Sequence, residues 1–389
     1  MKRIAVIVSH PIQYNSPVFK LLAASEGILL KVFYTWGQAQ GEKFDPGFGK
    51  NIAWDIPMLE GYEYEFMENT AKDPGSHHFR GIINPGLIRS VSAWHPDGVI
   101  VYGWNFQSHL SALRYFKGKV PVLFRGDSTL LDERPGIKRS MRKTFLRWVY
   151  GHVDYALYTG TRNKEYFIRH GLQEDQLIFA PHAIDNARFA GTGDQYSKEA
   201  GKWRHQLGIG AGDRVVLFAG KLEPKKNPFF LLELAARIPD PRLKFLVTGN
   251  GILEKALKEK ALADPRFLFL DFQNQQQMPL VYRLGDVFIL PSSGPGETWG
   301  LAVNEAMACG LAVMVSDKAG CAIDLVREGE NGMIIRGGDP GPAAGFLRSA
   351  LEDRNLLQVM GAHSRTLIQP FNNGQYVRAV LEIMKNSRL

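Results

Sequence analysis

The sequence predicts an α/β protein with two doubly wound domains, each built on a parallel sheet. The length of 389 residues exceeds what one hydrophobic core usually supports. Short runs that are apolar on both faces recur with helix-length segments between them, as strands covered by helices on both sides require. One polar, glycine-containing stretch, Ala190–Lys202, interrupts this rhythm, which then begins again. We therefore expect two domains joined by that linker.

The expected strands divide evenly between the two halves of the chain. In the first half they are Ile4–Val8, Leu29–Tyr34, Gly98–Tyr102, Val120–Phe124, Tyr155–Tyr158 and Leu177–Ala180. In the second half they are Val215–Ala219, Leu243–Val247, Phe267–Leu270, Val287–Leu290, Ala312–Val315 and Met333–Ile335. The predicted domains are therefore residues 1–190 and 203–370. The apolar positions after Pro370 predict an amphipathic helix over residues 371–389.

Composition limits the classes of protein to consider. Hydrophobic residues make up 45% and charged residues 22% of the chain, as in ordinary globular proteins. The net charge of +8 favours an anionic partner, which could be nucleic acid, a membrane surface or a phosphorylated ligand. The two cysteines, Cys309 and Cys321, match no zinc spacing and no disulfide framework. No apolar run is long enough for a signal peptide or a membrane span, so a cytoplasmic protein is expected.

The segment Asp286–Gly310 has the pattern of an anion-binding strand, loop and helix. An apolar strand, Val287–Leu290, precedes a loop of Pro, Ser and Gly, and a helix is expected from about Gly300. Backbone amides at such a helix start have no partner within the helix and attract an anion such as phosphate. Glu297 lies just before the helix and Glu305 lies eight residues later. The two acids can therefore flank the diphosphate of one elongated ligand.

The run PSSGPGETWGLAVNEAMACG, with its two acids at this spacing, resembles the signature of the retaining GT-B glycosyltransferases of family four, the glycosyl transferases group 1. The resemblance implies two Rossmann-like domains that face each other across a cleft, with a nucleotide diphosphate sugar bound by the C-terminal domain. It also implies that Glu297 contacts the donor sugar, that Glu305 contacts the ribose, and that the last helix crosses back onto the first domain.

Two lysines follow the first strand of the second domain, in the run VVLFAGKLEPKKNP. Lys221 and Lys226 lie at the carboxyl edge of the sheet, where cations can neutralise the charge of a departing diphosphate. The run resembles the family pattern in which an arginine and a lysine clamp the phosphates, with Lys221 in place of the arginine. Lysine lacks the bidentate fork of arginine, so Lys226 carries the resemblance more firmly. A solvated lysine-rich loop is the alternative.

Further donor contacts are expected from glycines and backbone amides. Gly249 lies in a strand-to-helix turn that the resemblance places near the nucleotide, although any such turn favours glycine. The amides of Gly300 and Leu301 are the phosphate-binding candidates at the helix start. Trp299, where the family usually has Phe, either contributes to donor binding or packs in the core. The segment FLFLDFQNQQQMP corresponds to the base-binding segment of the family, but it does not identify the base.

The first domain offers candidates for the acceptor site or the reacting centre. His10 and Gln13 replace the glycine-rich loop of many family members, which favours acceptor recognition there over donor contact. After the fourth strand, where the family commonly has a histidine, this chain has Arg125 and Asp127. Asp127 could accept a proton or bind an acceptor hydroxyl, and Arg125 could pair with it or with a phosphate. His109 supplies the missing imidazole only if its helix begins at the cleft. A structural His10 and a structural Arg125–Asp127 pair are the alternatives.

The segment APHAIDNARF ends the first domain and resembles the Asn-Gly-Val-Asp turn of the family. His182 and Ala183 stand in place of the Asn-Gly pair. Asp185 is expected to act in the turn or as a helix cap, because aspartate side chains accept hydrogen bonds from nearby backbone amides.

Residues 137–150 predict a basic amphipathic helix. Its basic residues are Lys138, Arg139, Arg142, Lys143 and Arg147, and its apolar residues are Ile137, Met141, Phe145 and Trp148. Such a helix can lie on an anionic membrane surface. A helix that packs its apolar side on its own sheet gives the same pattern, so both interpretations stay open.

These observations together predict a metal-independent, retaining glycosyltransferase without a cofactor. Its partners would be a nucleotide sugar donor and a glycan or lipid-linked glycan acceptor, in surface polysaccharide synthesis, with no nucleic acid. Glu297, Lys226 and Asp127 are the predicted catalytic residues. Contact with the inner face of a membrane is an open addition to the cytoplasmic location. A sugar phosphorylase or a nucleotide-sugar epimerase on the same scaffold is the alternative enzyme, and a basic nucleic-acid-binding protein is the alternative from another class.

Overall fold

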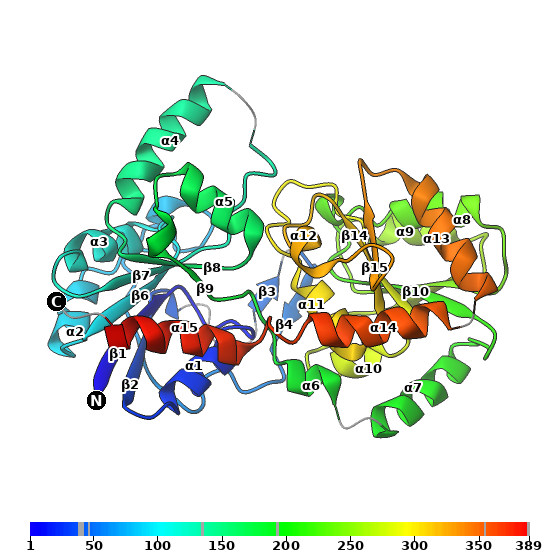
Figure 1. Ribbon diagram of the computed structural model, residues 1–389, viewed down its shortest axis with the longest axis horizontal. Helices are drawn as coiled ribbons and strands as arrows, with labels where there is room; N and C mark the ends of the chain where they lie inside the picture. The colour runs from blue at the N-terminus through cyan, green and yellow to red at the C-terminus, as the bar shows by residue number, and fades with distance from the viewer. Residues whose placement is uncertain (38–42, 46, 134–135, 192–193, 354, 387–389) are drawn as a thin grey trace. The chain divides into compact units, whose positions relative to one another are not determined.

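The structure, a computed structural model, describes residues 1–37, 43–45, 47–133, 136–191, 194–353 and 355–386 (Figure 1). The described chain forms two compact units. The N-terminal unit lies within residues 1–43, 56–182 and 372–389, and the C-terminal unit lies within residues 44–55 and 183–371. Each unit is built on a parallel sheet, which confirms the predicted α/β class.

The N-terminal unit contains a seven-stranded sheet in the order β5-β2-β1-β6-β7-β8-β9. Its strands are β1 (Lys2–Val8), β2 (Ile28–Tyr34), β5 (Glu63–Phe66), β6 (Gly98–Tyr102), β7 (Val122–Arg125), β8 (Tyr155–Tyr158) and β9 (Leu177–Phe179). All neighbouring strands run parallel, with Ile4 of β1 opposite Leu30 of β2 and Gly98 of β6. The strand order reverses direction beside β1, and loops at the carboxyl ends there are where open α/β sheets bind ligands.

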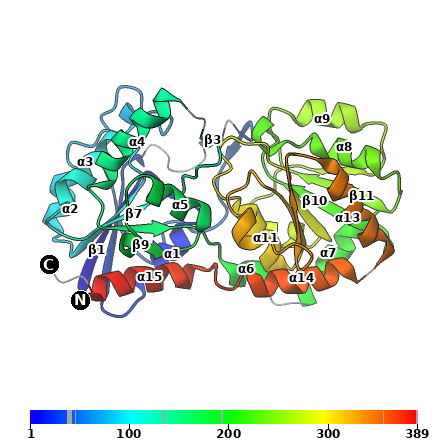
Figure 2. The ribbon, with the colours of Figure 1, turned by 45° about the horizontal axis from the view of Figure 1, so that its top comes forward.

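Helices cover both faces of this sheet, as Figures 1 and 2 show. They are α1 (Ser16–Ala23), α2 (Leu87–Ala93), α3 (Gln107–Phe116), α4 (Ile137–Tyr150), α5 (Thr161–Arg169) and α15 (Asn373–Asn386), with short 3-10 turns at Phe79–Gly81 and Glu174–Gln176. Ile4 and Val6 of β1 pack in the core beneath α1 and α15, whereas Ala5 and Ile7 pack beneath α2 to α5. Strand β1 is therefore buried on both faces, which explains its continuous apolar sequence. The C-terminal helix packs directly on α1.

The C-terminal unit contains a six-stranded parallel sheet in the order β12-β11-β10-β13-β14-β15. Its strands are β10 (Arg214–Ala219), β11 (Leu243–Thr248), β12 (Phe267–Leu270), β13 (Val287–Leu290), β14 (Ala312–Ser316) and β15 (Gly332–Ile335). Its helices are α6 (Asn186–Ala190), α7 (Asp194–Gln206), α8 (Phe230–Arg237), α9 (Glu254–Ala261), α10 (Met278–Tyr282), α11 (Leu301–Cys309), α12 (Ala322–Leu325), α13 (Pro340–Glu352) and α14 (Leu356–Leu367), with a 3-10 turn, η4 (Pro224–Lys226). A short two-stranded sheet pairs β3 (Lys43–Asp45) with β4 (Lys50–Ile52).

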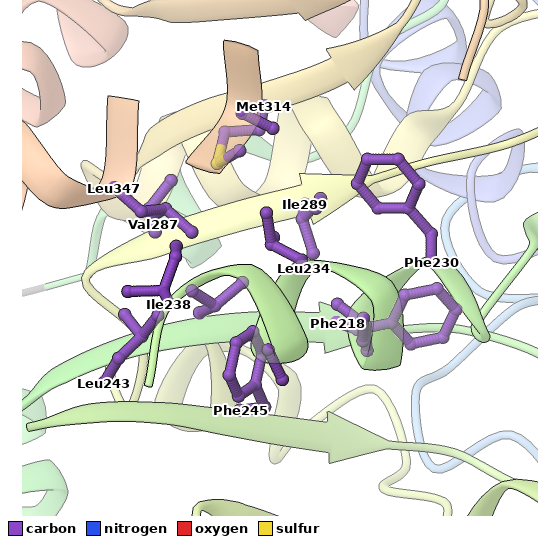
Figure 3. Close-up of a cluster of buried hydrophobic side chains, with 14 of the residues drawn as sticks. Phe218, Phe230, Leu234, Ile238, Leu243, Phe245, Val287, Ile289, Met314 and Leu347 are labelled. Carbon is purple, nitrogen blue, oxygen red and sulfur yellow. The ribbon is translucent and has the colours of Figure 1, made fainter. Parts of the chain in front are cut away.

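One face of this sheet packs on α8 and α13 (Figure 3). Phe230 and Leu234 lie four residues apart on α8, so both side chains point to the same side of the helix. They meet Phe218 of β10 and Ile289 of β13, all of them buried. Full burial of a Phe or Leu side chain contributes roughly 1.5–3 kcal/mol relative to exposure. This packing holds the sheet, and with it the loops at its carboxyl edge, in one place.

Three features differ from the sequence-based expectations. The predicted linker is wrong for residues 194–202, because these residues form most of helix α7. Strand β5 is absent from the sequence-based prediction, because its sequence, EYEF, alternates charged and aromatic residues and lacks the apolar run of a central strand. Its two glutamates, Glu63 and Glu65, pair with Lys31 of the adjacent strand β2 at 3.0 and 3.1 Å. Residues 44–55 and 183–190 group with the C-terminal unit, although both lie in the first 190 residues.

Candidate functional site

Strand β13 and helix α11 form the segment in which the sequence places the anion site. Strand β13 is completely buried, and Gly300 is the N-cap residue of α11 with φ of 108°. A side chain at this left-handed position would be strained, and its Cβ would lie 2.8 Å from Cδ2 of Leu290. Glycine also has no side chain that could cap the helix, so the N-cap residue offers no side-chain acceptor to the backbone amides of the first turn. The local geometry is that of an anion-binding helix start.

Glu297 lies beside this helix start and forms an ion pair with Lys226. The Lys226 Nζ is 2.6 Å from the Glu297 Oε2, and the two side chains are 17% and 8% exposed. The same Oε2 accepts a hydrogen bond from the Ser292 hydroxyl at 3.1 Å. The Glu297 Oε1 is 3.7 Å from the position that a Cβ on Gly300 would occupy. The structure therefore brings together Lys226, Glu297 and the start of α11, and adds Ser292, which the sequence did not single out.

Glu305 lies further along α11 and is only 3% exposed. Its Oε2 accepts a hydrogen bond from the hydroxyl of Tyr282, on α10, at 2.7 Å. A buried carboxylate needs such a donor, because burial without one is costly. Tyr282 is a second residue that sequence reasoning missed, since nothing in the sequence of α10 marks it as a partner of α11.

Trp299 is a packing residue in this structure. Its side chain is buried, its indole Nε1 donates to the Asn304 Oδ1 at 2.8 Å, and its ring centroid lies 5.9 Å from that of Phe371. The structure agrees with the packing role of the Trp299 ring, and a donor contact at this residue stays a prediction. The reason is physical: both the apolar ring and the polar N–H of the indole are satisfied inside the unit.

Two glycine turns adjoin the loop that carries Lys221. A Cβ on Gly249, which has φ of 122°, would collide with the backbone carbonyl oxygen of Gly220. The loops after β10 and β11 therefore approach each other closely only because position 249 is glycine. This packing is sufficient reason for glycine at position 249, and the predicted nucleotide contact stays a prediction.

Residues 47–55 cover Lys221 and the predicted base-binding segment. The Phe48 ring centroid lies 4.9 Å from the Lys221 Nζ and 4.9 Å from the Phe272 ring centroid. Asn274 donates to the Ala53 carbonyl at 2.7 Å, and the Gln276 amide donates to Asp55 at 3.1 Å. No sequence pattern predicts this contact, because the two segments are far apart in the chain. The Lys221 ammonium group therefore lies beside an aromatic ring, where a cation–π interaction stabilises it.

The structure assigns structural roles to His109 and Arg125 in the N-terminal unit. His109, on α3, is fully buried, with one ring nitrogen 2.8 Å from the Thr35 hydroxyl and the other 2.8 Å from the Tyr102 carbonyl oxygen. The Arg125 guanidinium donates to the backbone carbonyls of Leu157, Ala180 and Pro181. The proposed reacting-centre role of His109 is therefore wrong. These guanidinium hydrogen bonds anchor Arg125 to the backbone of its own unit, and a pairing with Asp127 or with a phosphate stays a prediction.

Asp127 is placed instead beside His182, with the His182 Nε2 4.0 Å from the Asp127 Oδ2. Burial first, and then the Arg125 guanidinium, lower the pKa of His182 to about 4, so its imidazole is neutral near pH 7. Asp127 and Trp104 line a cavity of about 330 Å³ at the carboxyl ends of β6 and β7. His182 was predicted only as part of a turn. The signal that could have identified His182 is its position shortly after β9, because β7 and β9 are parallel strands of one sheet and end at the same edge.

His10 and Gln13 lie in the loop after β1, as predicted, and both are partly buried. The His10 Nδ1 is 3.0 Å from the Ser9 hydroxyl, and its ring makes an edge contact with Trp36 at a centroid distance of 5.3 Å. Asp185 caps helix α6, because its carboxylate accepts a hydrogen bond from the Arg188 amide at 3.1 Å. The capping prediction for Asp185 is therefore confirmed.

Metal-ligand side chains meet at one place among the residues that the structure describes. Asp73, His77 and His78 lie in an exposed loop, with both histidine Nε2 atoms 3.3 Å from the Asp73 Oδ2. Neither Glu297 nor Glu305 belongs to this group. Its members are largely solvated ion-pair partners, and such pairs contribute little.

Burial of His109 predicts a pH-dependent stability. Burial lowers its pKa to about 4, whereas an unfolded histidine titrates near 6.5. The unfolded chain therefore binds more protons between these values, so the stabilisation is complete above pH 6.5 and is lost as the pH falls towards 4. The expected contribution is up to about 3 kcal/mol. Unfolding free energies measured from pH 7.5 to 4.5 should fall less steeply for His109→Gln than for wild type. His205→Gln, at an exposed position, should keep the wild-type slope; equal slopes for all three proteins would contradict the assignment.

Comparison with known proteins finds a family match in the C-terminal half of the chain. Residues 199–386 match the family described as glycosyl transferases group 1. A curated relative, the D-inositol 3-phosphate glycosyltransferase of Nocardia farcinica, is 28% identical over 225 residues, which cover 55% of this chain and 48% of that protein. The enzyme of the same name from Corynebacterium efficiens is 34% identical over 198 residues, or 48% of this chain and 45% of that protein. The chain spans about half the length of these curated relatives.

Solved structures share the fold over essentially the whole chain. The crystal structure of Anabaena HepE in complex with UDP covers 100% of both chains with a TM-score of 0.74 and 18% sequence identity. WaaG, a glycosyltransferase involved in lipopolysaccharide biosynthesis, covers 99% of this chain and 100% of its own, with a TM-score of 0.69 and 15% identity. At these identities the likeness concerns the fold, which is the predicted GT-B fold of these glycosyltransferases. Residues 199–386, which hold Lys221, Lys226, Glu297 and Glu305, match the family described as glycosyl transferases group 1, which is the family that the sequence resembles.

Proposed function

We propose that this protein is a retaining glycosyltransferase that moves a sugar from a nucleotide diphosphate sugar to a glycan or lipid-linked glycan. The observation that supports it most is the Glu297–Lys226 pair beside the glycine-capped start of α11, within the segment that matches the family. A cation and a row of amides suit a diphosphate, and a carboxylate next to them suits a sugar hydroxyl. No metal ion and no cofactor is part of the proposal.

In the proposed reaction, the bond between the sugar C1 and the diphosphate oxygen breaks while the acceptor hydroxyl oxygen bonds to C1 on the same face. The acceptor proton passes to the leaving phosphate oxygen. Lys226, Lys221 and the amides of Gly300 and Leu301 stabilise the charge that develops on the diphosphate. Glu297 holds the donor sugar in position and Glu305 holds the ribose. Asp127 and the neutral His182 bind the acceptor hydroxyl by hydrogen bonds and so orient it towards C1.

The known relatives suggest where to look for substrates. HepE has been crystallised with UDP, so a UDP-sugar is the first donor to test. WaaG takes part in lipopolysaccharide biosynthesis, which agrees with an acceptor that belongs to a surface polysaccharide. A lipid-linked acceptor would place the enzyme at the inner face of the cytoplasmic membrane, and this location is part of the same proposal.

The function is tested first by thermal shift with a panel of nucleotide sugars, because a bound donor raises the melting temperature by mass action. The donor that gives the largest shift is then incubated with candidate glycan acceptors, and the anomeric configuration of the product is read by NMR. Retention of the donor configuration supports the proposal. An inverted product, phosphate-dependent turnover, or epimerisation of the donor without acceptor would replace it with another reaction.

A further inference from the structure

A long loop, residues 67–86, connects β5 to α2 and contains one short 3-10 turn, Phe79–Gly81. Connections longer than about 12–15 residues without secondary structure of their own are uncommon in compact units, and many of them carry a function. The loop leaves the sheet at its edge strand, and β2, β1 and β6 lie between β5 and the strand that precedes Asp127. The loop is therefore a part of the N-terminal unit that the proposed reaction leaves without a role.

Hydrogen bonds from one side chain hold the base of this loop. The Asn69 Oδ1 accepts from the backbone amides of Ala71 and Ile83, at 3.1 and 2.9 Å. The Asn69 Nδ2 donates to the Gly81 carbonyl at 2.9 Å. The two ends of the loop are thus fixed to each other, and residues 72–80 between them form its tip.

The tip is folded tightly although it buries little. Among residues 72–80, all of which the structure describes, Gly75 alone is buried. The Gly75 amide donates to the Gly81 carbonyl, and the Gly81 amide donates to the His78 carbonyl, each at 3.1 Å. A Cβ at position 81 would collide with the Gly75 carbonyl oxygen, so this close approach requires glycine. With so few buried contacts, the order of the tip depends on its polar groups.

Three side chains that can bind a metal meet at this tip. The Nε2 atoms of His77 and His78 each lie 3.3 Å from the Asp73 Oδ2, and the three atoms all lie within 4.8 Å of one another. Ligand atoms around a tetrahedral Zn²⁺ ion, with bonds of about 2.0–2.1 Å, are about 3.3 Å apart. Two of the three ligand pairs therefore already have the separation that one shared ion requires.

The local backbone favours this arrangement of the two rings. The His77 ring lies against Gly75, where a Cβ would be 2.5 Å from the His77 Nδ1. The His78 Nε2 also lies 3.0 Å from the Asp73 carbonyl oxygen, to which it can donate its hydrogen. A metal ion would replace that hydrogen, which passes to Nδ1 or to solvent, because an imidazole binds a metal through a nitrogen lone pair.

Ion pairing alone does not account for a stable cluster here. The side chains of Asp73 and His77 are 73% and 65% exposed, and exposed ion pairs contribute little. Bonds from imidazole nitrogen and carboxylate oxygen to a transition metal persist in water and suit Zn²⁺. Mg²⁺ and Ca²⁺ prefer ligand sets made of oxygen atoms, so two imidazoles disfavour them.

We propose that Asp73, His77 and His78 bind one divalent transition-metal ion of the Zn²⁺ type, which clamps the tip of the loop. Three protein ligands leave the fourth tetrahedral position to water. The ion has a structural role and takes no part in the proposed sugar transfer. The proposal thus goes beyond the proposed function, and neither depends on the other.

The clamp also has a consequence for the neighbouring loop after β1. Ile82, which follows the tip, is buried together with Trp36 and Phe106. The Trp36 ring makes an edge contact with the ring of His10. A tip held by a metal ion would therefore restrict the motion of the segment that packs beside His10.

The main experiment titrates Zn²⁺ into the full-length protein, without an affinity tag and after removal of metals with a chelator, and measures binding by calorimetry. Wild type should bind one ion per chain, and excess Mg²⁺ or Ca²⁺ should not compete. Asp73→Asn and His77→Gln should each raise the dissociation constant of Zn²⁺ by about tenfold or more. Both positions are exposed, so the variants should keep the wild-type fold. His205→Gln, which removes an exposed histidine of the C-terminal unit, is the matched control and should bind as wild type does.

A variant that keeps all three ligands tests their positioning. Gly75→Ala places a methyl group against the His77 ring and should weaken Zn²⁺ binding severalfold. Its melting temperature in the presence of a chelator should stay close to that of wild type treated in the same way.

Limited proteolysis measures the clamp independently of affinity. Lys72 and Arg80 are exposed and lie on either side of the three ligands, so trypsin can cut at both ends of the tip. Zn²⁺ should slow cleavage after these two residues about tenfold in wild type, because cleavage requires local opening of the segment. It should not slow cleavage in His77→Gln. Mass spectrometry of the fragments identifies the cut sites.

Several results would overturn the proposal. They are no Zn²⁺ binding by wild type, wild-type affinity in both Asp73→Asn and His77→Gln, and an equal loss of affinity in His205→Gln. Effective competition by Mg²⁺ or Ca²⁺ would likewise reject a site built on imidazole nitrogen. Tryptic cleavage after Lys72 and Arg80 that does not respond to Zn²⁺ would reject the clamp.

Discussion

Glu297→Gln should lower kcat by about a hundredfold or more and leave the dissociation constant of the nucleoside diphosphate nearly unchanged. The change keeps the shape of the side chain but removes the charge that is expected to hold the donor sugar beside the developing positive charge at C1. Losing one preorganised electrostatic contact in an active site typically costs about 100-fold to 1,000-fold in rate. Steady-state kinetics and calorimetry with the nucleotide separate the two effects. Glu259→Gln, an exposed carboxylate on the same unit, is the matched control.

The ion pair with Lys226 allows a structural role of Glu297 to be separated from a catalytic one. Removing one partner of a largely buried pair leaves the other charge uncompensated, which destabilises the fold by a few kcal/mol. The double variant Lys226→Met/Glu297→Gln should recover most of that stability, because no unpaired charge remains. It should stay inactive if the two groups act on the substrate. Recovery of transfer activity together with stability, or full activity of Glu297→Gln, would rule out the proposed role.

Glu305→Gln should weaken binding of the nucleoside diphosphate about tenfold to a hundredfold. Hydrogen bonds to charged groups contribute roughly 1.5–3 kcal/mol, and the ribose hydroxyls would lose a charged acceptor. Calorimetry with the free nucleotide measures the effect without any sugar transfer. The change also alters the buried contact with Tyr282, so stability has to be measured on the same samples.

Tyr282→Phe is the matched control for this second prediction. It removes the hydroxyl that donates to the Glu305 Oε2 but leaves the carboxylate in place. If Glu305 contacts the ribose, Tyr282→Phe should lower the melting temperature and retain most of the nucleotide affinity. Equal losses of stability in the two variants, with unchanged affinity in both, would show that Glu305 serves only the packing of α10 on α11.

Much of the candidate site was predictable because its signals are local. The run from β13 to α11 combines a buried strand, a glycine that must adopt a positive φ and a helix, all within one segment. The position of Lys226 was predictable for the same reason, because its loop directly follows strand β10 in the sequence. Strand β5 and helix α7 were missed for the opposite reason, since a charged edge strand and a polar helix lack the apolar periodicity on which such predictions depend.

Residues with polar side chains were harder to assign, because their roles depend on partners that are distant in the chain. His109 met the sequence criterion for a reacting imidazole, yet Thr35 and Tyr102 enclose it. The sequence indicated only a turn at His182, yet the parallel arrangement of β7 and β9 in the sheet places His182 beside Asp127.

The amino-acid sequence alone was enough for the α/β class, for the family match of the C-terminal half and for the positions of Glu297, Glu305 and Lys226, because periodicity and motif spacing are properties of neighbouring residues. Only the tertiary structure decided that Glu297 pairs with Lys226, that Arg125 bonds to backbone carbonyls, and that the apolar side of α4 faces solvent instead of packing on its own sheet. The physical reason is that burial and charge pairing arise when segments far apart in the chain pack together, and no local pattern encodes which segments will meet.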